Sequence, residues 1–168
     1  RPTLHSMVKG LVFDFDSTLT APIFNQRLGA WMISDNPLVL EMDHQEVVAN
    51  FGGAERVQAV KGMLESLRKA KTEIFIVSIG RKRCIIPLLH AAGLLPFLEE
   101  RHIFGQDSTR LRAHKCVKAK LIAEIMTTHE WTFDDVLFVD DSARHIEVAS
   151  KVCRTRQSGS GGLSVGDM

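Results

Sequence analysis

Two acidic residues, Asp14 and Asp16, directly follow an apolar run, and their types and spacing could support chemistry. The run, residues 7–13, has the nearly continuous apolar character of a strand buried on both faces of a parallel sheet. Two carboxylates this close repel each other in a partly buried place, so a positive charge should lie beside them. A divalent metal ion is the simplest candidate.

The same pattern recurs near the other end of the chain, where the apolar run 136–139 ends in Asp140 and Asp141. Another apolar run, 73–77, ends in Ser78. In open α/β sheets, ligands bind outside the carboxyl ends of the strands. We therefore expect the ends of these strands to meet around one site.

Apolar residues recur at helical spacing between the strands, which predicts helices over about 54–70, 81–92, 113–128 and 143–150. Two short strands are also predicted, over residues 101–105 and 151–156. Strands that alternate with helices predict an α/β fold with a parallel sheet, right-handed crossovers and helices on both faces.

Several carboxylates and a serine hydroxyl around one point suit a hard cation such as Mg²⁺, which binds carboxylate and substrate phosphate oxygens. A carboxylate nucleophile can accept a phosphoryl group as an aspartyl-phosphate, and a second acid can protonate the leaving oxygen and later activate water. Such a site also needs a hydroxyl and a lysine bound to the phosphate oxygens. The residues therefore predict phosphoryl transfer.

These residues, in this order, resemble the four motifs of the haloacid dehalogenase (HAD) superfamily. The motifs are Asp14-x-Asp16-x-Thr18 after a strand, Ser78 after the second strand, a lysine further on, and Asp140-Asp141 after the fourth. The resemblance spans residues 7–156. It implies a Rossmann-like sheet with strand order 3-2-1-4-5 and a Mg²⁺-dependent phosphatase with a minimal or absent cap.

The resemblance also implies a role for each residue. Asp14 would be the nucleophile and a Mg²⁺ ligand, and Asp16 would be the general acid and base, with its backbone carbonyl on the metal. Thr18 would support the loop by hydrogen bonds, and Ser78 would bind the phosphoryl group. The pair Asp140–Asp141 would complete the metal site, and in relatives the second acid is often the direct ligand.

Asp16 bears most on the reaction class. Superfamily members that act as dehalogenases or as ATP-driven pumps lack an acid at this position, so the chain resembles the phosphatase and phosphomutase branches. Two alternatives remain open: a phosphomutase, which generally needs a larger cap to shield the phosphoenzyme from water, and a HAD-like binding scaffold with little turnover.

Three lysines lie at the start of the helix predicted before the fourth strand. Lys118 is the preferred phosphate ligand, because Ile122 and Ile125 mark a buried stripe that places it on the sheet-facing edge. Lys115 is the alternative, since it would share a helix face with Lys118. Lys120 is rotated by about 200° from Lys118 and is expected to face water.

Basic residues flank the predicted site. Residues 80–120 have a local charge balance of +6. Arg81 and Arg83 follow the second strand, and Arg110 and Arg112 precede the lysine helix. One hypothesis is that these four form a positive collar for the non-reacting part of an anionic substrate. The alternative is an ordinary solvated basic face.

A small cap-like insertion, residues 21–53, is predicted after the first strand. Proline and glycine residues would bound two short helices in it, about 23–33 and 38–50. An insertion of this size leaves the site open. The substrate could therefore be a small phosphorylated metabolite or a phosphoprotein, and the sequence does not choose between them.

At 168 residues the chain is long enough for one domain, predicted over residues 1–156 and followed by a flexible Gly- and Ser-rich tail, 157–168. A net charge of +1 and the lack of a long apolar run give no reason to expect nucleic acid or a membrane as a partner. Three widely spaced cysteines favour reduced thiols and a cytoplasmic location. The histidines, His145 among them, lack metal spacing and are interpreted as surface or boundary residues.

Overall fold

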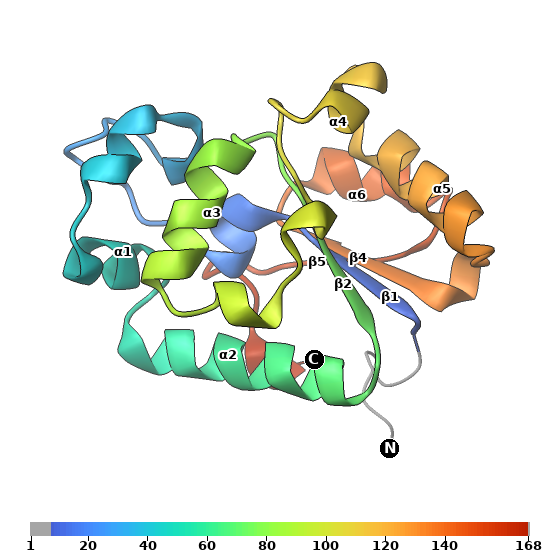
Figure 1. The fold of residues 1–168 in the computed structure, drawn as a ribbon, viewed down its shortest axis with the longest axis horizontal. Helices are drawn as coiled ribbons and strands as arrows, with labels where there is room; N and C mark the ends of the chain where they lie inside the picture. The colour runs from blue at the N-terminus through green and yellow to red at the C-terminus, as the bar shows by residue number, and fades with distance from the viewer. Residues whose placement is uncertain (1–7, 168) are drawn as a thin grey trace.

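The computed structural model describes residues 8–167, and its centre is a sheet of five parallel strands (Figure 1). In chain order the strands are β1 (Gly10–Phe13), β2 (Glu73–Val77), β3 (Ile103–Phe104), β4 (Val136–Asp140) and β5 (Arg154–Gln157). Their order in the sheet is β3-β2-β1-β4-β5, so the predicted α/β class and strand order are confirmed. Residue 7, the first residue of the predicted first strand, lies outside the described residues.

The register of the central strands brings their carboxyl ends together. Phe13, the last residue of β1, pairs with Ile76 of β2 and with Val139 of β4. Residues that follow these three strands therefore leave the sheet at the same edge, as the sequence predicted.

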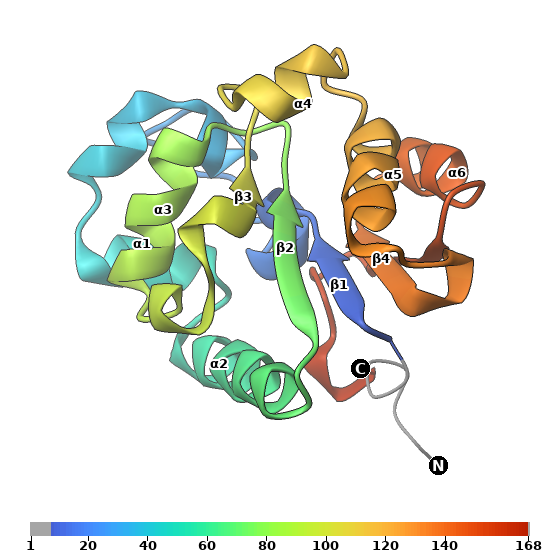
Figure 2. The ribbon, with the colours of Figure 1, turned by 45° about the vertical axis from the view of Figure 1, so that its right-hand side comes forward.

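Helices cover both faces of the sheet (Figure 2). On one side lie α1 (His44–Asn50), α2 (Ala54–Lys69) and α3 (Lys82–Ala91), and on the other lie α4 (Thr109–Ala113), α5 (Lys118–His129) and α6 (Ala143–Ala149). Alternate residues of β1 serve the two cores. Leu11 and Phe13 pack in the core with α2 and α3, whereas Val12 packs in the core with α5.

The insertion differs from its prediction, because no helix forms over 23–33. Instead, Asn25 and Ala30 form an antiparallel bridge, closed by a turn in which Gly29 has the left-handed φ of +61°. Tight 3-10 turns follow at Ile33–Asp35 and Pro37–Glu41. The second predicted helix, 38–50, is shorter than expected, because its first residues form the turn Pro37–Glu41 and the helix itself begins only at His44.

The start of α1 explains that shortening. The side chain of Asp43 accepts a hydrogen bond from the N–H of Glu46, and the side chain of Glu46 accepts one from the N–H of Asp43. This capping box fixes the beginning of α1 at His44. The preceding 3-10 turn therefore cannot continue into the helix.

The helix predicted over 113–128 is also divided. Helix α4 ends at Ala113, Lys115 and Cys116 both have left-handed φ values of +55° and +57°, and α5 begins only at Lys118. The N–H of Cys116 returns to the carbonyl of Leu111 (2.9 Å), which closes the turn between the two helices. Lys115 and Lys118 therefore do not share a helix face.

The segment predicted as a flexible tail returns to the domain. Strand β5 extends to Gln157, beyond the predicted boundary at residue 156. Leu163 is buried in the first core, and its N–H donates to the carbonyl of Thr18 (2.9 Å). The packed part of the chain therefore continues past β5, because Leu163 supplies an apolar anchor there. Among residues 8–167, no helix is long and apolar enough to span a membrane.

Candidate active site

A cavity of about 320 Å³ opens at the carboxyl ends of β1 and β4. Asp14 follows β1, and its N–H still donates to the carbonyl of Val139 on β4 (2.9 Å). The chain then makes a tight turn over Phe15–Leu19, in which Ser17 has a left-handed φ of +59°. This turn places Asp14, Asp16 and Ser17 in the wall of the cavity.

Asp14, Asp140 and Asp141 form an acidic cluster in this wall. Each offers a carboxylate oxygen, and these oxygens lie within 4.8 Å of one another. Asp14 and Asp140 are buried, whereas Asp141 is exposed. Although the Asp141 residue is exposed, its carboxyl group is partly shielded from water by its neighbours, and this desolvation together with the adjacent Asp14 and Asp140 raises the pKa of Asp141 to about 7. Because their oxygens lie so close together, these three acids are the residues that could hold a metal ion. A divalent cation bound there would lower the pKa of Asp141.

Lys118 is the lysine that reaches the cluster. Its Nζ lies 2.7 Å from Asp14 Oδ1 and 2.7 Å from Asp140 Oδ2, and the residue is only 4% exposed. Burial alone would lower the pKa of Lys118, but the two carboxylates raise it above its usual value. The ammonium group therefore stays charged. Lys115, the alternative, is exposed and is not among the residues that line the cavity.

Asp140 is held from several sides. Its Oδ1 accepts a hydrogen bond from the N–H of Ser142 (2.8 Å), and its Oδ2 accepts bonds from Lys118 and from His145 Nδ1 (3.1 Å). Burial raises the pKa of Asp140, but the bonds from His145 and Lys118 outweigh it and lower the pKa to about 2. Asp140 is therefore ionised.

His145 is a site residue that the sequence interpretation missed. It lines the cavity from the first part of α6, five residues after Asp140. A histidine about one helical turn beyond a strand-end acid can point back at that acid, and this spacing could have identified it.

Asp16 is held by the insertion. The N–H of Ser34 donates to Asp16 Oδ1 (3.2 Å), and the hydroxyl of Ser34 is hydrogen-bonded to Oδ2. Burial raises the pKa of Asp16 to about 6, although the bonds from Ser34 act in the opposite direction. Asp16 can therefore carry a proton near neutral pH. Gly80 is required beside this pair, because a Cβ at that position would collide with the Ser34 side chain.

Ser34 is a second site residue that the sequence interpretation missed. Its carbonyl accepts from the N–H of Arg81 (2.9 Å), and the neighbouring Asp35 accepts from Gln106 Nε2 (2.7 Å). The insertion is therefore fastened to the loops that follow β2 and β3. A loop serine has no spacing signal in the sequence, so only the tertiary structure identifies it.

The two predicted hydroxyl groups are placed differently. Thr18 Oγ1 donates to Asp14 Oδ2 (3.2 Å), directly beside the acid that it was predicted to support. Ser78 is 1% exposed, and its Oγ accepts from the N–H of Gly80 (2.9 Å). The wall of the cavity is formed at this point by Ile79 rather than by Ser78.

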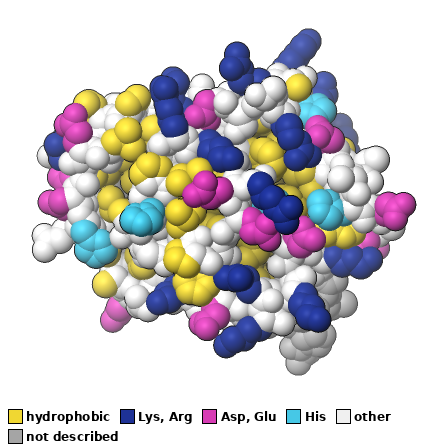
Figure 3. Space-filling view, viewed as in Figure 1, with side chains coloured by type: hydrophobic (Ala, Val, Ile, Leu, Met, Phe, Trp, Pro, Cys, Tyr) yellow, Lys and Arg dark blue, Asp and Glu magenta, His cyan; other side chains and the backbone are white. Residues whose placement is uncertain are grey.

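The four arginines of the predicted collar do not line the cavity. Arg110 forms an ion pair with Glu124 on α5 (2.8 Å), and Arg81 lies 3.5 Å from Asp35. Arg83 and Arg112 are exposed. On the face shown in Figure 3, Lys and Arg side chains lie among Asp and Glu side chains.

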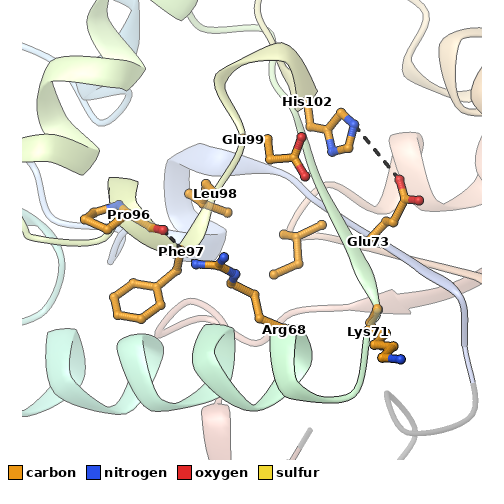
Figure 4. Close-up of a pocket in the computed structure, with 10 residues that line it drawn as sticks. Arg68, Lys71, Glu73, Pro96, Phe97, Leu98, Glu99 and His102 are labelled. Carbon is orange, nitrogen blue, oxygen red and sulfur yellow. Dashed lines mark hydrogen bonds and ion pairs between the residues drawn. The ribbon is translucent and has the colours of Figure 1, made fainter.

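A second cavity, of about 230 Å³, lies at the opposite end of β2 (Figure 4). Arg68 donates to the carbonyl of Pro96 (2.9 Å) at its edge, and His102 lies 4.0 Å from Glu73, the first residue of β2. Burial lowers the pKa of His102. None of the site residues predicted from the sequence lines this cavity, so it is separate from the acidic cluster.

Comparisons with solved structures agree on the fold. One similar structure is the HAD domain of the effector protein Lem4 from Legionella pneumophila, an inactive mutant (TM-score 0.61, 15% identity, 96% of this chain and 90% of that chain). Another is a predicted phosphoglycolate phosphatase from Haemophilus somnus (TM-score 0.60, 16% identity, 94% and 88%). A third is L-2-haloacid dehalogenase from Xanthobacter autotrophicus with chloropropionic acid covalently bound (TM-score 0.56, 15% identity, 96% and 80%).

By sequence, no protein-family model and no curated protein matches the chain. The resemblance to the superfamily therefore rests on the order of the motif residues in the sequence. The solved structures support it through the fold that they share with this chain. The strand order, the acidic cluster after β1 and β4, and these similar structures together show that the protein has the fold of the haloacid dehalogenase superfamily.

Proposed function

We propose that this protein is a Mg²⁺-dependent phosphatase, which hydrolyses phosphomonoesters through an aspartyl-phosphate on Asp14. The supporting observation is the environment of Asp14. This buried carboxylate is held at Oδ1 by Lys118 and at Oδ2 by Thr18, and it lies beside Asp140 and Asp141. A carboxylate fixed in this way is oriented in advance for attack on a bound substrate.

The donor set fits Mg²⁺. Carboxylate oxygens suit a hard cation, and the three acids of the cluster offer oxygens at compatible separations. Lys118 already compensates charge on Asp14 and Asp140, so Asp141, with its raised pKa, has the most to gain from a cation. When bound there, Mg²⁺ would offset the negative charge of the substrate phosphate.

In the first step, an oxygen of Asp14 attacks phosphorus. The bond between Asp14 and phosphorus forms, the bond to the ester oxygen breaks, and the leaving oxygen takes the proton of Asp16. The raised pKa of Asp16 suits this role, because an acid that titrates close to the working pH is an efficient proton donor. The ammonium group of Lys118 stabilises charge on the transferred phosphoryl group.

In the second step, water attacks the phosphoryl group and Asp16, now a carboxylate, takes the proton of that water. The bond between Asp14 and phosphorus breaks, inorganic phosphate leaves, and Asp16 is again protonated. The backbone N–H and the hydroxyl of Ser34 keep Asp16 in place throughout.

Dehalogenation is the competing reaction, because one of the similar structures is a haloacid dehalogenase. In that reaction a carboxylate attacks the carbon atom that carries the halogen, and the halide leaves without needing a proton. A buried acid whose pKa is raised to about 6 would have no task in that step. Asp16 therefore favours phosphate ester chemistry.

The test is hydrolysis of the phosphomonoester p-nitrophenyl phosphate, with MgCl₂ and with EDTA. We expect hydrolysis with Mg²⁺, its loss in EDTA, and a loss on the order of 10³-fold or more in Asp14→Asn. Asp134→Asn, which changes an exposed aspartate before β4, is the matched control and should retain activity.

Two results would contradict the proposal. One is the absence of Mg²⁺-dependent hydrolysis across a broad panel of phosphomonoesters, and the other is full activity in Asp14→Asn. Release of chloride from 2-chloropropionate would indicate dehalogenation instead.

A further inference from the structure

A third cavity, distinct from the one in Figure 4, adjoins the active-site cavity. It also has a volume of about 320 Å³, and the two cavities share Ser17 and Asp141 in their walls. The acidic cluster is therefore not at the bottom of a single pocket. It lies at the middle of a trough that continues on both sides of Asp141.

The two ends of this trough differ in chemistry. On one side the wall includes Met32 and Ile79. Trp31, which directly precedes Met32, is 59% exposed. The ring of Trp31 lies 5.1 Å from that of Phe24, beside the Asn25–Ala30 bridge of the insertion. Four large apolar residues flank this bridge and are all partly exposed, and we call them the hairpin patch: Ile23, Phe24, Trp31 and Met32.

The other end of the trough is polar and formed by the segment after β5. Gln157, Ser158, Gly159 and Ser160 line it. The hydroxyl of Ser158 lies 3.4 Å from that of Thr18, so this wall is in contact with the turn that carries Asp14. Apart from Gln157, the side chains of this segment are small, and Gly159 and Ser160 follow Ser158, whose N–H is held by the carbonyl of Asp140 (2.9 Å).

We propose that the substrate is a phosphorylated protein segment that lies along this trough. Its phosphorylated residue would be at the acidic cluster, an apolar flanking residue would contact the hairpin patch, and the opposite flank would contact the segment 157–160. This inference rests on the proposed phosphatase function and specifies its substrate class. An extended chain with unlike flanks can occupy both ends of the trough at once, whereas a small ester needs only its centre.

A membrane surface fits the hairpin patch less well. The insertion carries an excess of carboxylates, because Asp35, Glu41, Asp43 and Glu46 stand against a single Lys or Arg residue, Arg27. These would repel anionic lipid headgroups. A peptide can place an apolar side chain on the patch without approaching them.

The experiment compares synthetic phosphoserine peptides of equal length and net charge. One carries Leu on one flank and Gly-Ser on the other, the second has the flanks exchanged, and the third has Ser on both flanks. Phosphate release is measured with Mg²⁺, beside p-nitrophenyl phosphate as the small substrate. We expect one Leu orientation to exceed the all-Ser peptide by about tenfold in kcat/KM, the usual worth of an apolar contact.

Variants show which residues of the trough cause the preference for the Leu peptide over the all-Ser peptide. Met32→Ser and Trp31→Ser should reduce the Leu-to-Ser ratio to about 1–3, because the apolar contact is lost. Ser160→Trp should lower kcat/KM for all peptides more than for p-nitrophenyl phosphate, because its side chain obstructs the polar end. Phe133→Ser is the matched control, since Phe133 is an aromatic residue 46% exposed at the amino end of β4, and it should leave the ratio unchanged.

The outcomes separate the two proposals. Hydrolysis of p-nitrophenyl phosphate without any preference among the peptides, or with a preference that survives both Met32→Ser and Trp31→Ser, would overturn the peptide inference and leave the phosphatase function standing. The absence of hydrolysis of every phosphomonoester would overturn the function, and the inference with it.

Discussion

Asp16 is a carboxyl group that the fold makes costly to ionise. Its pKa rises from 3.8 to about 6 because the residue is buried, so the folded state binds its proton more tightly than the unfolded state does. The resulting loss of stability begins as the pH rises above 3.8 and is complete above about 6. At roughly 1.4 kcal/mol for each pKa unit, it amounts to about 3 kcal/mol at neutral pH.

Asp16→Asn should therefore stabilise the protein. In EDTA at pH 7.5, we expect its free energy of unfolding in urea to exceed that of the wild type by up to about 3 kcal/mol, because Asn needs no proton to be neutral. The difference should shrink as the pH falls toward 4. Asp134→Asn, at an exposed position, should show no such trend. A difference that grows on acidification would contradict the assigned burial of Asp16.

The turn between α4 and α5 allows an element-scale prediction, because it contains a lysine with left-handed φ. A residue other than glycine costs roughly 1–2 kcal/mol in that conformation, so Lys115→Gly should raise the free energy of unfolding by about 1 kcal/mol. Lys120→Gly, inside α5, should lower it by about 1 kcal/mol. Both side chains are exposed, so the pair isolates the backbone.

Urea denaturation of the two glycine variants provides the measurement. The two substitutions should change the free energy of unfolding in opposite directions only if α5 begins after the turn. Equal destabilisation of both variants would mean that Lys115 lies in a continuous helix, as the hydrophobic pattern alone suggested.

At the scale of the whole molecule, the features that could be predicted from the sequence are those that follow from long apolar runs, namely the central strands and the acids at their ends. The runs before Asp14 and Asp140 identified the central strands, and parallel pairing then placed both acids at one edge. Lys118 was identified because a buried helical stripe orients it. Ser34 could not be found in this way, since its contact with Asp16 depends on how the insertion docks and not on a period in the sequence. His145 did have a spacing signal, five residues after Asp140, but it was interpreted as a surface or boundary residue.

Arg56 connects parts of the chain that lie far apart in the sequence. From the first turns of α2, its guanidinium group donates to the carbonyls of Thr18 (2.8 Å) and Leu163 (3.2 Å), and also to those of Leu19 and Phe51. It therefore joins the turn after Asp14 to the segment that follows β5. Burial lowers the pKa of Arg56, but a guanidinium group remains charged at neutral pH.

Arg56→Met should reduce the free energy of unfolding by about 3 kcal/mol, because several carbonyls lose a charged donor. At this chain length, that corresponds to a fall in Tm of roughly 6–12 °C. Arg68→Met is the matched control on the same helix, since Arg68 is exposed and donates to one carbonyl, and its effect should stay below about 1 kcal/mol. Limited proteolysis should also cut the segment 158–167 faster in Arg56→Met than in Arg68→Met. If stability and protease resistance are both unchanged in Arg56→Met, then β5 and the buried Leu163 hold that segment without the arginine.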